Sequence, residues 1–146
     1  MIIKFKIGYI YNITILHVWR YFILKNFNKD IGNYGENLSV EFLKRNGYYI
    51  LSRNFRNRSG EIDIISRKDD LIIFIEIKSR YNYNHGSPIE AITYSKQKQI
   101  IKLCKFYMYI NKLIKYNIRF DVIEVFFNKD NNLYSINHIT DAFRES

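Results

Sequence analysis

Three charged residues interrupt two otherwise apolar stretches and could together carry out metal-dependent chemistry. Asp63 lies within Ile62–Ile65, and Glu76 and Lys78 lie at the end of Leu71–Lys78. Alternate residues of a strand face the same side about 6.6 Å apart, so Glu76 and Lys78 share one face. Burying either charge without a partner costs several kcal/mol. The pattern therefore indicates a site rather than a plain core strand.

The acids of this group are suited to a divalent cation. If the two strands pair through the turn Arg67–Asp70, Asp63 and Glu76 converge and repel each other unless a cation lies between them. Carboxylate oxygens favour Mg²⁺ or Mn²⁺. Glu36 on a preceding helix could add a ligand through water, and Lys78 could orient or activate water. These are the parts that phosphodiester cleavage requires; an ordinary Glu76–Lys78 ion pair is the alternative.

The hydrophobic pattern predicts the elements that position these residues. A helix is expected to begin near Gly35 and to stop at Gly47, and a second helix to run from about Lys96 to Lys112 with Ser95 as its N-cap. Strands are expected at Tyr48–Phe55, Glu61–Ser66, Leu71–Lys78, Ile118–Phe127 and Leu133–His138. This order predicts an α/β fold in which helices flank a mixed β-sheet.

The chain is strongly basic, which favours polyanionic partners. It carries 23 Lys and Arg against 14 Asp and Glu, a net charge of +9. Nucleic acid and an anionic membrane surface both fit this balance. The single cysteine, Cys104, excludes an internal disulfide and a zinc site of several thiolates, and its apolar neighbours favour a buried structural thiol. A cytoplasmic location is the default expectation.

Residues 1–31 form an N-terminal apolar and basic extension, and residues 32–146 are expected to form one domain. The run Ile7–Leu24 is interrupted by Asn12, His17 and Arg20, so no stable membrane insertion is expected. Three interpretations stay open: a packing or surface-lying helix, an anchor at a membrane interface, and a segment that is not translated because the protein starts at Leu24.

The second helix carries basic residues that suit phosphate contact. Between Ala91 and Phe120 there are seven basic residues and no acidic ones, and a solvated helix face ordinarily mixes both signs. A plain solvated face remains the alternative. Lys96, in the first turn, could reach the acidic site. The residues expected to contact nucleic acid are Arg56, Arg58, Arg80, Lys96, Lys98, Lys102 and Lys105. Asp121 is expected to cap a buried network or to pair with Arg119.

Four motifs, in order, resemble one known family. Gly35–Leu38, Gly60–Ile65, Phe74–Arg80 and Arg119–Val122 are similar to the YraN family of small bacterial proteins. An acid on one strand followed by Glu-x-Lys on the next also resembles the PD-(D/E)xK nuclease superfamily. The resemblance implies a restriction-endonuclease-like fold, similar to archaeal Holliday junction resolvases. It further implies a metal site at Asp63 and Glu76, with Lys78 beside it and Glu36 as the helical acid.

Three functional hypotheses follow from these observations. The first is metal-dependent hydrolysis of DNA, rather than RNA, with branched DNA as one candidate substrate. The second is a non-catalytic nucleic-acid-binding protein that keeps the nuclease fold. The third is an interaction protein whose basic helix meets an acidic partner or a membrane. The sequence does not choose among substrates, and a homodimer stays open.

Overall fold

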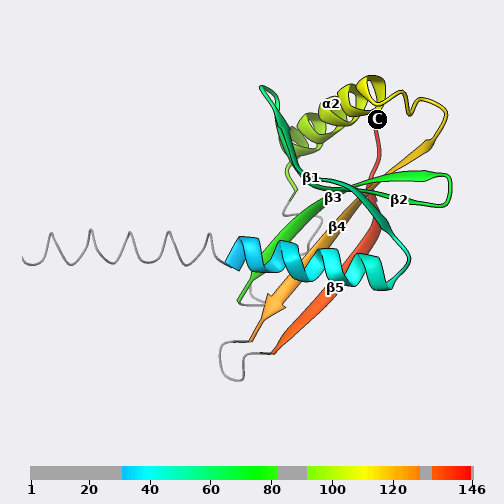
Figure 1. Ribbon diagram of the computed structural model, residues 1–146. Helices are drawn as coiled ribbons and strands as arrows, with labels where there is room; N and C mark the ends of the chain where they lie inside the picture. Colours follow the sequence, from blue (N-terminus) through cyan, green and yellow to red (C-terminus); the bar gives the residue numbers. More distant parts are fainter. Residues whose placement is uncertain (1–30, 82–91, 129–132, 146) are drawn as a thin grey trace, which may run out of the picture. The chain divides into compact units, whose positions relative to one another are not determined.

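The computed structural model describes residues 31–81, 92–128 and 133–145 (Figure 1). A helix covers residues 31–45 within this part of the chain. The elements that follow it are β1 (Tyr49–Asn57), β2 (Gly60–Lys68), β3 (Leu71–Arg80), α2 (Tyr94–Ile110), β4 (Asn117–Phe127) and β5 (Tyr134–Phe143). The compact unit that contains them is Gly35–Ser146. The predicted α/β fold with a mixed sheet and flanking helices is confirmed.

The five strands form one sheet in the order β1-β2-β3-β4-β5. Pairing is antiparallel from β1 to β3 and from β4 to β5, whereas β3 and β4 are parallel. Antiparallel neighbours can be joined by tight turns, but parallel neighbours need a crossover connection. The crossover between β3 and β4 contains α2, which places the start of this helix near the end of β3.

The two helices cover opposite faces of the sheet. Phe74 of β3 and Phe120 of β4 pack in a buried cluster with Leu103 and Tyr107 of α2. The alternate positions point the other way. Gly35 of the first helix lies against Ser79 of β3 so closely that an added Cβ would meet the Ser79 hydroxyl oxygen at 1.9 Å. Because Glu76 and Lys78 alternate with Ser79, they belong to the α2 face.

The first helix ends as the sequence predicts, at Gly47. The backbone amide of Tyr48 donates to the carbonyl of Leu43 at 3.0 Å and that of Gly47 donates to Lys44 at 3.1 Å, the two bonds of a Schellman motif. Gly47 has a φ of 80°, which glycine adopts without steric cost. The predicted start near Gly35 is too late, because residues 31–34 are already helical.

Two other boundaries differ from the prediction. The second helix runs from Tyr94 to Ile110 and takes Thr93 as its N-cap, whose side chain accepts a bond from the Lys96 amide, so Ser95 already lies inside the helix. The last strand continues beyond His138 to Phe143. Its sequence alternates weakly in hydrophobicity, and long-range pairing with β4 decides its length.

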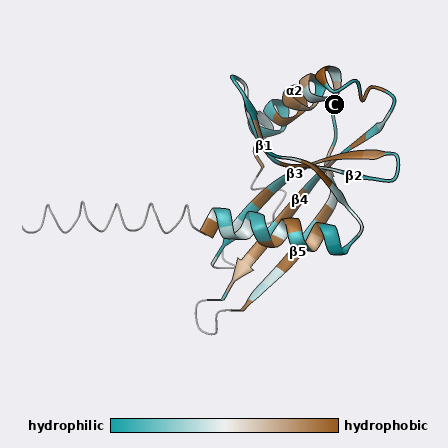
Figure 2. Cartoon of the chain, viewed as in Figure 1, coloured by the Kyte–Doolittle hydropathy of each residue, from teal (hydrophilic) through white to brown (hydrophobic). Residues whose placement is uncertain are grey.

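Hydrophobic residues concentrate in the central strands, while the β1–β2 and β2–β3 turns are hydrophilic (Figure 2). Cys104 is buried in the cluster under α2, and burial raises the pKa of its thiol to about 12, consistent with the structural role expected. Among the described residues, no helix is both long and apolar enough to span a membrane. The predicted extension, apart from residue 31, lies outside the described part of the chain.

Candidate active site

Asp63 lies where the pairing of β2 with β3 ends. Regular register runs from Lys68↔Leu71 to Ile64↔Ile75, and the next position would set Asp63 opposite Glu76. Instead of a further backbone pair, the Asp63 carboxylate accepts a hydrogen bond from the backbone amide of Ile77 through Oδ2, at 2.7 Å. The side chain is thereby fixed between the two strands, next to Glu76. The expected convergence of these two acids is present.

Glu76 is a buried carboxylate with a lysine on each side. Its side chain is 5% exposed, and Oε1 accepts a hydrogen bond from Lys78 Nζ at 2.8 Å. Lys96 Nζ of α2 lies 3.2 Å from Oε2, but without hydrogen-bond geometry, so Oε2 has no hydrogen-bond partner among the described residues. The ordinary Glu76–Lys78 ion pair that the sequence left open is therefore formed. Lys96 also reaches the site, as expected.

Glu36 is held at the site by a residue that the sequence analysis did not select. Asn54 of β1 donates its side-chain amide to Glu36 Oε2 at 3.0 Å, and Arg53 approaches the same oxygen at 3.8 Å. Asn54 has a φ of 51° and lies between the paired positions Arg53↔Ile64 and Phe55↔Ile62. Asparagine is among the non-glycine residues that most often adopt this left-handed conformation. The sequence feature that could have identified Asn54 is an asparagine in the middle of an expected strand.

The electrostatics of Asp63 reflect its crowded, desolvated position. Burial and the neighbouring charge of Glu76 raise the pKa of Asp63 to about 7, and Glu36 makes the smallest contribution in the same direction. The hydrogen bond from Ile77 and the charge of Lys96 oppose this rise. A buried carboxylate beside a second acid is a place where positive charge is favoured. A proton, an ammonium group or a metal ion can supply that charge.

Within residues 31–81, 92–128 and 133–145, no three His, Cys, Asp or Glu side chains lie close enough together to bind one metal ion. Asp63 and Glu76 lie close together, but Glu36, the third expected ligand, does not form a group of three with them. Mg²⁺ in proteins is often bound by one or two carboxylates and completes its octahedron with water and substrate phosphate oxygens. The donor chemistry of the pair, and the buried Glu76 oxygen without a hydrogen bond, fit such an ion.

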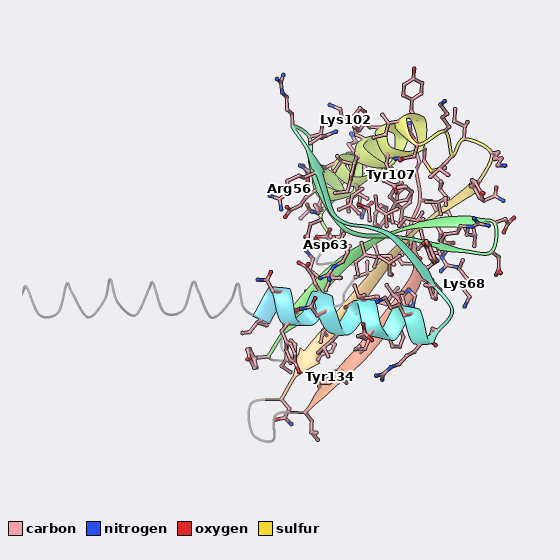
Figure 3. The ribbon with its side chains drawn as sticks, in the orientation of Figure 1. Arg56, Asp63, Lys68, Lys102, Tyr107 and Tyr134 are labelled. Atoms are coloured by element: carbon pink, nitrogen blue, oxygen red, sulfur yellow. The ribbon has the colours of Figure 1, made fainter. Side chains whose placement is uncertain are left out.

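Apart from Lys96 at Glu76, the expected nucleic-acid contacts fall in three places. Arg56 and Arg58 lie at the β1–β2 hairpin, whose Gly60 packs against Gln99 of α2; Figure 3 labels Arg56 near α2. The α2 lysines Lys98, Lys102 and Lys105 line a surface pocket of about 450 Å³ together with Tyr94, Arg144 and Glu145. Arg80 ends β3 on the same face as Glu76.

Three of these basic residues have partners that the sequence did not indicate. The Arg56 guanidinium lies 4.0 Å from a Glu61 carboxylate oxygen. Lys98 Nζ lies 4.4 Å from the centroid of the Tyr94 ring, and Lys105 pairs with Glu145 near the C-terminus. Arg53, three residues before Arg56 on β1, donates to Asn37 Oδ1 at 2.7 Å and approaches Glu36. Arg53 therefore supports the site rather than an open surface.

Asp121 belongs to a separate buried network, as expected. Its carboxylate accepts two hydrogen bonds from Arg119 at 2.8 Å and one from the Asp141 backbone amide at 3.0 Å, and His138 Nε2 lies 2.8 Å from Oδ2. Burial alone would raise the pKa of Asp121. The hydrogen bonds from His138, Arg119 and Asp141 outweigh this effect, so the net pKa is lowered. The network faces the first helix, where Phe42 contacts the His138 ring edge-on.

Known proteins are similar to this chain over most of its length. The family model described as "Uncharacterised protein family UPF0102" matches residues 35–125. A UPF0102 protein of Clostridium botulinum (strain Alaska E43 / Type E3) is 55% identical over 121 residues, which are 83% of this chain and 99% of the relative. One from Clostridium novyi (strain NT) is 56% identical over 118 residues, 81% of this chain and 98% of the relative. The chain therefore belongs to the UPF0102 family, which is the YraN family.

Proposed function

We propose that this protein is a metal-dependent endonuclease that acts on DNA, branched DNA included, in the cytoplasm. The observation that carries the proposal is the placement of Asp63 beside the buried Glu76 at the end of the β2–β3 pairing, with the Lys78 ammonium on Glu76. Asp–Glu-x-Lys arranged across two adjacent strands is the pattern that the sequence analysis linked to nucleases. Glu76 and Lys78 share one face of β3, and Lys96 from the first turn of α2 reaches Glu76 on that face.

The acids would hold Mg²⁺ or Mn²⁺. Asp63 and Glu76 supply hard oxygen ligands, and Glu36, held by Asn54, is suited to a contact through water. When bound, the cation supplies Lewis-acid stabilisation of phosphate charge and favours ionisation of the attacking water. Lys96, near the first turn of α2, offsets part of the negative charge of the two acids.

Lys78 carries out the step that needs a proton donor or a fixed positive charge. An ammonium group has three donors and no acceptor, so it binds no metal. Its stem is anchored on β3, and in this structure its Nζ donates to Glu76 Oε1. A cation beside the two acids stabilises charge that develops on a phosphate oxygen during cleavage.

The DNA backbone would follow the basic residues that extend from the site. Lys96 starts this path at Glu76, and Lys98, Lys102 and Lys105 continue it over roughly 10 Å of helix, at about 1.5 Å per residue. Arg56 and Arg58 on the β1–β2 hairpin offer a second contact. Lysine and arginine contacts to phosphates supply most of the affinity for nucleic acid and little sequence specificity.

The presence of two lysines at Glu76 favours a second candidate function, a nucleic-acid-binding protein without turnover. Lys78 and Lys96 already place two positive charges within 3.2 Å of the Glu76 oxygens. A carboxylate neutralised in this way needs no metal for the fold. The two functions differ in whether Mg²⁺ displaces a lysine from Glu76.

Metal-induced stabilisation and cleavage together test the proposal. An ion that binds the folded state alone raises its stability by mass action. The melting temperature of the full chain is measured with 0 and 10 mM Mg²⁺ or Mn²⁺, for wild type, Asp63→Asn and the matched surface variant Asp69→Asn. Wild type and Asp69→Asn should gain stability from the metal, whereas Asp63→Asn should not.

Cleavage of linear, flapped and four-way-junction DNA is then followed for the same three proteins. Metal-dependent products from wild type and Asp69→Asn, and none from Asp63→Asn, support the endonuclease. A metal-induced shift without cleavage of any of these DNAs or of RNA would favour the binding-only function. Equal metal shifts in all three proteins would remove Asp63 from the metal site.

A further inference from the structure

Glu124 of β4 is a buried acid that the proposed mechanism does not use. Its side chain is 1% exposed, and its Oε1 has no hydrogen-bond partner in the described part of the chain. Oε2 accepts one long hydrogen bond, at 3.4 Å, from the side-chain amide of Asn137. Removing a carboxylate from water without pairing it with a cation is strongly unfavourable. The position of Glu124 is therefore one that a positive charge would stabilise.

The nearest cation by strand register is Lys78. In the parallel pairing of β3 with β4, Lys78 lies directly beside Glu124. Adjacent strands are about 4.8 Å apart and register partners point to the same face, so the two side chains are neighbours. In this structure the Lys78 ammonium is bonded to Glu76 Oε1 instead. Lys78 thus has one buried carboxylate two residues back on its own strand and another on the adjacent strand.

A metal ion at Glu76 would change which of these carboxylates holds the ammonium. Glu76 already has Lys78 at Oε1 and Lys96 3.2 Å from Oε2, so a divalent ion there would add a third cation to one carboxylate, and these cations repel one another. Lys78 has a flexible four-carbon stem and a side chain that is 29% exposed, so its end can move. The open Oε1 of Glu124 is an acceptor on the same face.

We propose that Glu124 is the second partner of Lys78: when a divalent cation occupies Glu76, the Lys78 ammonium moves to Glu124, which holds it beside the site. The proposal rests on the metal-dependent function argued above. Glu124 is a positioning residue, because it acts through Lys78 and has no contact with substrate. The arrangement keeps the ammonium beside the two acids while it frees Glu76 Oε1 for the metal.

Mn²⁺ binding to the full chain, measured by titration calorimetry without DNA, tests this exchange. Glu124→Gln keeps the size of the side chain and its contact with Asn137 but removes the charge. The displaced ammonium then has no anion to receive it, so Mn²⁺ affinity should fall three- to tenfold. In the Lys78→Met background there is no ammonium to relocate, so adding Glu124→Gln should change Mn²⁺ affinity by less than twofold. Glu41→Gln, an exposed acid on the first helix, is the matched control and should match wild type.

A plain long-range attraction between Glu124 and the metal predicts a different result. That attraction would persist, or grow, when Lys78 is replaced, so an equal or larger loss of affinity in the Lys78→Met background would overturn the proposal. If Asp63→Asn abolishes Mn²⁺ binding while Glu124→Gln has no effect in either background, this inference fails and the metal site stands. If wild type binds no Mn²⁺, both fail.

A spectroscopic readout on wild type does not depend on any variant folding. The Nζ resonance of Lys78, assigned by its absence in Lys78→Met, is followed in ¹⁵N-detected ammonium spectra as Mg²⁺ is added. A shift of this resonance with a continuing hydrogen-bonded signature is expected in wild type, and Glu124→Gln should lose that signature at saturating Mg²⁺. A Lys78 resonance that does not respond to saturating Mg²⁺ would contradict the exchange.

Discussion

Asp63 Oδ2 accepts a hydrogen bond from the backbone amide of Ile77 at 2.7 Å. A side chain of β2 therefore replaces a backbone partner at the point where β2 and β3 separate. This bond fixes Asp63 beside Glu76 and satisfies an amide that would otherwise lose its partner. The acid therefore has two roles, one in holding the strands and one in the charge of the site, and these can be separated by substitution.

Asp63→Asn and Asp63→Ala should both abolish the metal-induced rise in melting temperature but differ in metal-free stability. Asparagine keeps a side-chain oxygen that can accept from Ile77, whereas alanine leaves that amide unsatisfied at a cost of about 1–3 kcal/mol. Asp63→Asn should therefore be the more stable of the two in urea titrations without metal. Equal stability of the two variants would show that the Ile77 bond contributes little.

Lys78→Met should reduce cleavage while it spares DNA binding. Methionine retains much of the apolar packing of the lysine stem and removes the ammonium. Under single-turnover conditions the cleavage rate should fall by roughly two or more powers of ten. DNA affinity, measured by fluorescence anisotropy, should stay within about threefold of wild type, because one charge among several phosphate contacts is lost.

Lys68→Met is the matched control for that variant, since Lys68 ends β2 and donates to the Asn46 carbonyl away from the site. It should cleave at the wild-type rate. Wild-type cleavage by Lys78→Met would end the catalytic assignment. If Lys78→Met fails to fold, Lys78 is a structural partner of Glu76.

Asn54→Gly should weaken metal binding with little loss of stability. Glycine accepts the left-handed backbone of this position and removes the amide that holds Glu36. Mn²⁺ affinity should fall about threefold or more, and the free energy of unfolding should stay within about 1 kcal/mol of wild type. Asn54→Ala loses the same amide and adds about 1–2 kcal/mol of backbone strain.

Asp69 provides a matched pair of controls, because it has a φ of 54° in the β2–β3 turn. Asp69→Ala should be less stable than Asp69→Gly, as Asn54→Ala is less stable than Asn54→Gly, but neither Asp69 variant should change Mn²⁺ affinity. Wild-type affinity in Asn54→Gly would show that Glu36 reaches its position without the amide.

Replacing Lys98, Lys102 and Lys105 by Gln should weaken DNA binding and reduce its dependence on salt. Each lost phosphate contact lowers the slope of log affinity against log salt concentration by about 0.9, so three contacts lower it by about 2.7. Binding is measured between 50 and 200 mM NaCl. A control variant with Gln at Lys44, Lys68 and Lys115 loses the same charge elsewhere on the surface and should keep the wild-type slope. Equal slopes in all three proteins would indicate that the α2 lysines form a solvated face.

Asp121→Asn should destabilise the fold by roughly 3 kcal/mol at pH 7, because Arg119 and His138 lose a buried carboxylate. The pKa of Asp121 is lowered in the folded state, so its contribution is complete above the unfolded value near 3.8 and is lost as the pH falls through the lower folded value. Urea titrations from pH 7 to pH 2.5 should show the wild-type advantage shrinking below about pH 4. A constant difference over this range would contradict the assigned network.

The sequence by itself determined the strands and the central acids of the site. Alternation of apolar residues is a local property, so it marked β3 and showed that Glu76 and Lys78 share a face. The Asp63–Glu76 convergence followed from one short turn between neighbouring strands. Gly47 fixed the end of the first helix because few other residues adopt its backbone conformation without cost.

The tertiary structure decided which distant residues complete the site. Asn54 reaches Glu36 across 18 positions of sequence, and Glu124 becomes the neighbour of Lys78 through the parallel pairing of β3 with β4. Parallel pairing depends on how α2 packs over the sheet, and no local pattern encodes its register. Glu124 therefore resembles an ordinary strand acid in the sequence, and only its burial beside Lys78 distinguishes it.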